Sequence, residues 1–252
     1  MRWIEVDNYE QMSEQAAAVV INLVKEKPEA VIGLATGGTP AGTYKRLIDD
    51  YKQNTTSYEN IKTVNLDEYV GLEKESDQSY TYYMDKHLFD HINLKRENIH
   101  LPKAETPPYE QDAKDYEQLI EDLGGVDLQV LGIGENGHIG FNEPGTPFSS
   151  KTGVVELDPS TREANARYFE NKDDVPTHAI SMGISTIMKS RKIILLASGA
   201  KKAPILYNLF KTDVTEEIPA SILKEHPDVT IIADSEALAL LKEKKEVLTV
   251  DY

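Results

Sequence analysis

Short apolar runs alternate with segments of helical periodicity along the chain. The runs long enough for buried strands lie at residues 30–35, 61–66, 128–133, 193–197 and 229–233. Between the first two runs, Tyr44, Leu47, Ile48 and Tyr51 recur at the spacing of one helix face. Strands that are apolar throughout are typical of parallel sheets covered by helices on both faces. The pattern therefore predicts an α/β fold, Rossmann-like, with an open, mostly parallel sheet flanked by helices.

Further apolar stripes predict helices elsewhere in the chain, at residues 80–88, 116–123 and 203–210. Residues 134–151 are rich in Gly, Pro and Asn and match neither periodicity, so we expect a long loop there. Such loops after strands commonly carry the chemistry of α/β proteins. No linker or internal repeat interrupts the pattern, and a length of 252 residues suits one large domain, so we expect residues 1–252 to form a single domain.

Composition narrows the classes of function. The chain has 27 Lys and Arg against 43 Asp and Glu, a net charge of -16, which repels nucleic acid and anionic membrane surfaces. It has no cysteine, which excludes disulfides, thiolate metal sites and a cysteine nucleophile. It shows neither a secretory leader pattern nor a run of 18 apolar residues. We therefore expect a soluble cytoplasmic protein that binds an anionic ligand, if it binds one, through a local cluster of donors.

A glycine-rich turn follows the first apolar run. It reads Thr36, Gly37, Gly38, Thr39 and then Pro40, with Thr39 as the expected N-cap and Pro40 as the first helical residue. A helix N-terminus offers free N–H groups, and two glycines let an anion approach without a Cβ clash. The turn is a candidate phosphate site, although the same letters also suit a tight strand-to-helix turn with no ligand.

Two acidic residues end the second apolar run. If the first two strands are neighbours, Asp67 lies at the carboxyl edge of the sheet beside the glycine-rich turn, where it could take a carbon-bound proton. The alternative is that Asp67 and Glu68 are solvated residues that cap the turn.

Residues 132–137 spell GxGxxG after a strand, but two more glycines and a proline follow, so the helix of a dinucleotide-binding motif is not expected. The same loop offers His138 and Glu143 as an acid and base pair. The alternative for His138 is a loop histidine hydrogen-bonded to backbone.

The remaining candidates are cations and a pair of histidines. Arg162, Arg167, Lys201 and Lys202 could bind an anion, and Lys202 opens a helix after the fourth apolar run. Any of them could equally serve surface solubility. His87 and His91 stand one helical turn apart, a spacing that can bind metal, but His87 falls in an apolar stripe and we interpret both as structural.

Together these segments resemble the glucosamine-6-phosphate deaminase family. The resemblance rests on LATGGTP at 34–40, NLDEYVGL at 65–72, LGIGENGHIGFNEPGT at 131–146, ANARYF at 164–169 and PASILKEHPDV at 219–229. The blocks occur in order over residues 30–233, and GHIGFNEP is the most specific of them. The resemblance implies a sugar-phosphate isomerase type of sheet and a cofactor-free, metal-free conversion of glucosamine 6-phosphate to fructose 6-phosphate and ammonia, as in the catabolism of N-acetylglucosamine.

The resemblance also implies roles for individual residues. Thr36, Gly37, Gly38 and Thr39, with Arg167 and Lys202, would hold the phosphate. His138 would open the sugar ring by moving a proton between O1 and O5, with Glu143 as its carboxylate helper. Asp67 would then remove the proton from C2, which becomes acidic once the aldehyde is free.

The chain departs from the family pattern in two places. Many members have an aspartate where this chain has Asn136, which can orient the imidazole of His138 but cannot stabilise its charged form. Allosteric hexameric members carry basic residues where Gly153 and Val155 occur here. We therefore expect hyperbolic kinetics in a monomer or small homo-oligomer. The rival functions are a 6-phosphogluconolactonase-like hydrolase and a sugar-phosphate sensor without catalysis.

Overall fold

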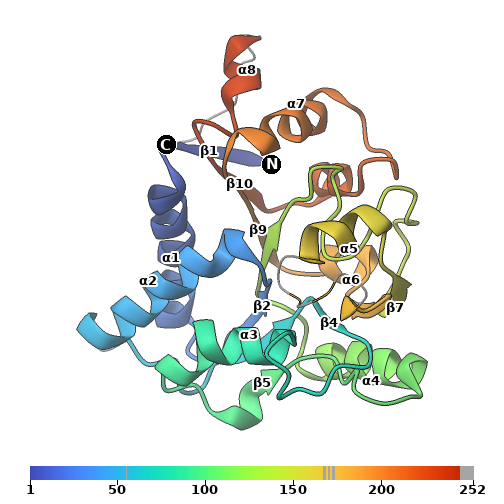
Figure 1. Cartoon of the computed structure of the whole chain (residues 1–252). Coiled ribbons are helices and arrows are strands. Elements are labelled where there is room, and N and C mark those ends of the chain that lie inside the picture. Colours follow the sequence, from blue (N-terminus) through green and yellow to red (C-terminus); the bar gives the residue numbers. More distant parts are fainter. Residues whose placement is uncertain (55, 167–168, 170, 172–173, 245–252) are drawn as a thin grey trace.

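A computed structural model describes residues 1–54, 56–166, 169, 171 and 174–244. Its main element is a seven-stranded sheet with the strand order β1-β10-β9-β6-β2-β3-β5 (Figure 1). Every neighbouring pair in this sheet runs parallel. The strands are β1 Arg2–Val6, β2 Val31–Leu34, β3 Lys62–Asn65, β5 Ile99–His100, β6 Leu128–Gly132, β9 Lys192–Ala197 and β10 Val229–Asp234.

Helices cover both faces of the sheet, each over its own apolar core. On one face lie α1 Tyr9–Glu26, α2 Gly38–Asn54 and α3 Tyr80–His87. On the other lie α4 Tyr109–Asp122, α6 Ile184–Met188, α7 Ala203–Lys211 and α8 Ala239–Glu243 (Figure 1). The central strands between them are almost wholly buried, as in β10, where all six residues are buried. The predicted helix-covered α/β sheet is therefore confirmed.

The five predicted strands correspond to β2, β3, β6, β9 and β10, but the sequence pattern missed two edge strands and a second sheet. In β1 only Trp3 and Val6 are buried, because this edge strand is half-covered and so lacks the continuous apolar run of a central strand. The second sheet has the antiparallel order β4-β8-β7 and consists of β4 Asp67–Tyr69, β8 His178–Ser181 and β7 Gly153–Glu156. Its strands of three or four residues are too short to give a periodic signal.

The predicted start of the second helix was wrong by a short distance. Helix α2 begins at Gly38, so Thr39 lies inside its first turn instead of capping it. Gly37 has φ of 97°, and this left-handed conformation turns the chain from β2 into the helix within a few residues. The helix thus begins closer to β2 than the predicted N-cap at Thr39 and first helical residue at Pro40 indicated.

The remaining elements are short. They are α5 Pro159–Asn165 and the 3₁₀ turns η1 Phe89–His91, η2 Arg96–Asn98, η5 Ala200–Lys202 and η6 Pro219–Glu225. Residues 134–151 lie outside all named helices and strands, which confirms the predicted long loop. None of the described helices is long and apolar enough to cross a membrane.

Candidate active site

The residues predicted for the site follow four adjacent strands. Lys202 comes after β9, His138 after β6, residues 36–39 after β2 and Asp67 after β3, and these strands are consecutive in the sheet. Because the strands are parallel, their carboxyl ends lie at one edge. The chain runs outward in one direction from β2 to β3 and β5, and in the other from β6 to β9 and β10. Parallel sheets place their ligand sites where the order reverses in this way, here between β2 and β6.

Asp67 is a buried carboxyl group. Its residue is 7% exposed, and burial together with the neighbouring Glu68 raises its pKa from 3.8 to about 8. Among the described residues, none donates a hydrogen bond to the Asp67 carboxylate. A carboxyl with so high a pKa is a much stronger base, once ionised, than a solvated aspartate, and a general base works best with a pKa near the working pH.

Glu68, next in the chain, is also buried but has a structural role. Its carboxylate accepts hydrogen bonds from the backbone N–H groups of Tyr69, Tyr80 and Thr81, each at 2.9 Å, and from the Thr81 hydroxyl at 3.1 Å. Two of these N–H groups belong to the first turn of α3, so Glu68 fixes that helix to β4. The interpretation of Asp67 and Glu68 as solvated residues was therefore wrong, because both carboxylates are buried.

The loop after β6 is attached to the segment that carries Asp67. The backbone N–H of Phe141 donates to the Ser181 hydroxyl at 3.1 Å, and the Asn142 side chain donates to the carbonyl of Met182 at 2.9 Å. The N–H of Met182 in turn donates to the carbonyl of Leu66 at 2.7 Å. These bonds hold the His138 loop and Asp67 against one common segment, the end of β8.

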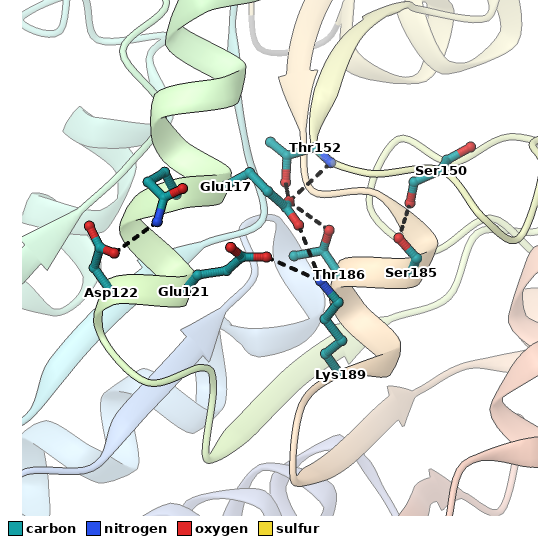
Figure 2. A network of polar contacts seen from close by, with 9 residues as sticks. Glu117, Glu121, Asp122, Ser150, Thr152, Ser185, Thr186 and Lys189 are labelled. Atoms are coloured by element: carbon teal, nitrogen blue, oxygen red, sulfur yellow. Dashed lines mark hydrogen bonds and ion pairs between the residues drawn. The ribbon is translucent and has the colours of Figure 1, made fainter.

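The far end of the same loop is anchored by a buried glutamate, which Figure 2 shows among its partners. Glu117 of α4 accepts hydrogen bonds from the backbone N–H and hydroxyl of Thr152, at 3.2 and 2.6 Å, and from the hydroxyl of Thr186 at 2.7 Å. Burial opposes its charge, but these donors outweigh burial and lower the pKa of Glu117. Close by, the Ser185 hydroxyl donates to the carbonyl of Ser150 at 2.8 Å. The loop is therefore held both at Phe141 and Asn142 and at its far end.

His138 and Glu143 meet within this loop. Nδ1 of His138 lies 3.3 Å from Oε2 of Glu143. The Asn136 side chain donates to the same oxygen at 2.7 Å, and the hydroxyl of Thr161, on α5, donates to Oε1 at 2.6 Å. Burial alone would raise the pKa of Glu143, but the nearby imidazole of His138, with the donors Thr161 and Asn136, lowers it to about 2. Glu143 is therefore ionised at neutral pH and can stabilise a protonated imidazole.

The geometry of the loop shows how two predicted residues, His138 and Asn136, contact Glu143, and it adds a third. The ring of His138 faces a carboxylate, as expected for an acid and base pair. The amide of Asn136 holds Glu143, and its Oδ1 accepts from the backbone N–H of His138 at 3.1 Å, so Asn136 acts on the ring through Glu143. Thr161 was missed, because a single threonine on a short helix gives no sequence signal of its partner.

An aromatic cluster was also missed. Tyr69 and Tyr80 have ring centroids 4.7 Å apart, and Tyr80 stacks on Phe141 at 6.3 Å. The ring of Phe169 meets Tyr69 edge-on at 5.9 Å. These rings come from β4, from α3, from the loop after β6 and from the segment after α5. They therefore pack β4, which carries Asp67, against the His138 loop. Residues so far apart in sequence are not recognisable as one cluster from the pattern alone.

The cations and the candidate anion turn are placed as follows. Lys202 sits at the start of α7, and burial lowers its pKa, an effect that the charge of Glu135 opposes. A Cβ added at Gly37, Gly38 or Gly199 would meet no atom within 4 Å, so the space beside both glycine turns is open. Arg167 lies outside the described residues.

Three other candidates have structural partners. A nitrogen of Arg162 donates to the carbonyl of Val175 at 3.0 Å. His87 packs on Tyr83 with centroids 4.3 Å apart, and Nε2 of His91 lies 2.9 Å from the carbonyl oxygen of Lys86. Within the described part of the chain, no group of three or more His, Cys, Asp or Glu residues could hold a metal ion.

Comparison with known proteins decides the family. The model of the family "Glucosamine-6-phosphate isomerases/6-phosphogluconolactonase" matches residues 6–232. The chain belongs to this family. It is 58% identical over 245 residues to a glucosamine-6-phosphate deaminase of Geobacillus sp. (strain WCH70), covering 97% of this chain and 98% of that one. It is 54% identical over 240 residues to one of Bacillus pumilus (strain SAFR-032), covering 95% and 100%.

Solved structures of family members agree with the fold. A monomeric glucosamine-6-phosphate deaminase superposes with a TM-score of 0.94 at 48% identity, covering 95% of this chain and 100% of that one. The 6-phosphogluconolactonase of Thermotoga maritima superposes with a TM-score of 0.73 at 20% identity, covering 93% and 99%, and at that identity the likeness concerns the fold alone.

Replacing Asp67 by asparagine is expected to stabilise the protein as pH rises. The folded pKa of about 8 exceeds the unfolded value near 3.8, so the folded state binds the extra proton between these values. The free energy of unfolding of the wild type therefore falls as pH rises from about 4 through about 8. An asparagine side chain does not ionise, so the variant does not lose stability in this way. Urea unfolding should find Asp67→Asn more stable by ~2 kcal/mol or more at pH 8, since each pKa unit is worth about 1.4 kcal/mol.

The exposed Asp122 of α4 provides the matched control, because Asp122→Asn makes the same substitution at the protein surface. A stability difference for Asp67→Asn that is equally small at pH 5 and pH 8 would contradict the raised pKa.

Replacing Asn136 by aspartate is expected to raise the pKa of Glu143. The new carboxylate would stand where the amide now lies 2.7 Å from Oε2, and two carboxylates at that distance resist ionising together. Carboxyl ¹³C NMR of glutamate-labelled protein should show the Glu143 signal, assigned with Glu143→Gln, titrating about 1 unit or more higher. An unchanged titration would mean that the amide contributes nothing to the ionised state of Glu143.

Proposed function

We propose that this enzyme converts glucosamine 6-phosphate and water to fructose 6-phosphate and ammonia, as a glucosamine-6-phosphate deaminase of amino-sugar catabolism. The names of its relatives support the substrate. The observation that carries the chemistry is the buried Asp67, whose pKa of about 8 suits a base that removes a carbon-bound proton, at the same sheet edge as the His138 and Glu143 pair.

The first step is ring opening. His138 accepts the proton of the O1 hydroxyl and delivers it to O5 as the C1–O5 bond breaks and the aldehyde forms. Glu143, ionised because its pKa is about 2, stabilises the imidazole while it carries the proton. The carboxylate does not itself take the proton under neutral conditions, since its hydrogen-bond donors favour the charged form.

The second step is proton transfer from carbon. In the open chain the C2–H lies next to the aldehyde, and the ionised carboxylate of Asp67 removes it to give an enolamine. Return of a proton to C1 gives the ketose imine at C2, and water adds there and expels ammonia. These steps need an acid and base at two positions and call for no redox group, covalent nucleophile or metal.

The phosphate end is assigned to the glycine-rich turn. The N–H groups at the start of α2 and the ammonium group of Lys202 would hold the phosphate, with Arg167 added on the strength of the sequence resemblance. The open space beside Gly37, Gly38 and Gly199 supports this assignment. In a chain of net charge -16, such a cluster of donors is needed to hold an anion. We further propose that the enzyme acts in the cytoplasm.

Asp67→Asn is expected to slow ammonia release from glucosamine 6-phosphate by about 10²- to 10⁴-fold, the usual loss for a missing general base. The assay is run with a chelator present, and Asp122→Asn should match the wild type. Hydrolysis of 6-phosphogluconolactone, with no ammonia release from the wild type, would favour the lactonase instead. Binding of the sugar phosphate with neither reaction would favour a sensor, and release abolished by the chelator would reveal a metal requirement.

The kinetics are expected to be hyperbolic in a monomer or small homo-oligomer. Gly153 and Val155, which stand where allosteric members carry basic residues, lie in the edge strand β7 and offer no cation to an effector phosphate. Rate curves with and without N-acetylglucosamine 6-phosphate, combined with sedimentation analysis, check this. Sigmoidal curves that the effector makes hyperbolic would contradict it.

A further inference from the structure

Two tyrosine hydroxyls hold the carbonyl groups of the glycine-rich turn. The hydroxyl of Tyr83, on α3, donates to the carbonyl oxygen of Gly37 at 2.6 Å. The hydroxyl of Tyr9, the first residue of α1, donates to the carbonyl oxygen of Gly38 at 2.8 Å. The two tyrosines come from different helices, and each fixes one of two successive peptide groups.

Fixing these carbonyls also fixes the direction of the next two N–H groups. In a trans peptide the C=O and the following N–H point to opposite sides. The bond from Tyr83 therefore points the N–H of Gly38 away from that tyrosine, and the bond from Tyr9 does the same for the N–H of Thr39. Both N–H groups belong to the first turn of α2, where no acceptor within the helix is available.

The two sides of the turn differ in packing. A Cβ on Gly42, one turn along α2, would lie 2.3 Å from the Ser13 hydroxyl and 2.9 Å from the ring of Tyr9. A Cβ on Gly37 or Gly38 would meet nothing within 4 Å. The helix therefore packs closely against α1, while open space remains beside the turn for an anion.

Tyr9 makes a second bond that makes its hydroxyl hard to replace. Its oxygen accepts from the backbone N–H of Gly42 at 2.8 Å while its proton goes to the carbonyl of Gly38. An α-helix ordinarily joins this i and i+4 pair directly, so the hydroxyl bridges the first turn of α2. Removing the oxygen would take away one of the bonds that fix the orientation of the Gly38 peptide group.

We propose that Tyr9 and Tyr83 are positioning residues of the phosphate site, whose hydroxyls turn the N–H groups of Gly38 and Thr39 toward the phosphate. The inference rests on the proposed function, in which this turn holds the sugar phosphate. The two tyrosines, from α1 and α3, do not touch the ligand. They set the affinity for phosphate by fixing the orientation of the peptide groups that bind it.

The test uses Tyr9→Phe, Tyr83→Phe and the double variant, with Tyr82→Phe as the control. Tyr82 lies on α3 beside Tyr83, but its side chain is exposed. The measured quantities are Ki for inorganic phosphate as a competitive inhibitor, KM for glucosamine 6-phosphate, kcat and Tm. A lost hydrogen bond of ordinary strength predicts a rise of about three- to tenfold in both Ki and KM for each single variant, larger than any change in kcat.

The double variant should show roughly the product of the two single effects, because the hydroxyls act on different peptides. Tyr82→Phe should leave Ki and KM at wild-type values. A lower Tm with Ki unchanged would overturn the proposal, since the hydroxyls would then only stabilise α2. A wild type that inorganic phosphate neither inhibits nor stabilises thermally would overturn it as well.

Failure of the proposed function is distinguishable from failure of this inference. If the wild type releases no ammonia but phosphate raises its Tm, and that rise shrinks in both tyrosine variants but not in Tyr82→Phe, the positioning role stands and the deaminase assignment falls. If ammonia release is normal and phosphate affinity is the same in all variants, the deaminase assignment stands and the positioning role falls.

Discussion

The structure depends on shielding a carboxyl group from water at the edge of a parallel sheet. Asp67 follows the end of β3 as the first residue of β4 in the short second sheet, and its burial raises the pKa to about 8. Contact with water would return the pKa to its ordinary value, because a solvated aspartic acid ionises near pH 4. The surrounding features can be understood through that requirement. Glu68 takes four hydrogen bonds and fixes α3, the aromatic rings pack around β4, and the His138 loop is attached to the end of β8.

The two carboxylates proposed to act in catalysis, Asp67 and Glu143, have different surroundings. Asp67 is buried, and no described residue donates a hydrogen bond to its carboxylate. Its protonated form is therefore favoured, and the carboxylate is a strong base once ionised. Glu143 has three polar partners, which hold its pKa at about 2 and keep it charged beside His138. The opposite pKa shifts suit the two proposed roles, a base that removes a carbon-bound proton and an anion beside an imidazole. Pairs of titratable groups with opposite shifts are a common sign of divided acid and base roles.

The sequence predicted the central fold well, because parallel strands buried on both faces leave continuous apolar runs. The glycine-rich turn, Asp67, His138 and Lys202 each follow a strand that the pattern identifies, and these strands are consecutive in the sheet. Their roles in a site stay predictions. The pattern could not reveal contacts between distant segments. Thr161 reaches Glu143 across 18 positions, Tyr9 and Tyr83 reach Gly38 and Gly37 from other helices, and the second sheet joins strands of three or four residues.

The most direct test of this account follows the C2–H bond itself. With glucosamine 6-phosphate deuterated at C2, NMR can measure both the loss of deuterium from C2 and the catalysed interconversion of the two anomers. If Asp67 is the base for carbon and His138 opens the ring, Asp67→Asn should lose the first process by about 10²-fold or more while it still catalyses the second. Deuterium loss at the wild-type rate in Asp67→Asn would contradict the central claim.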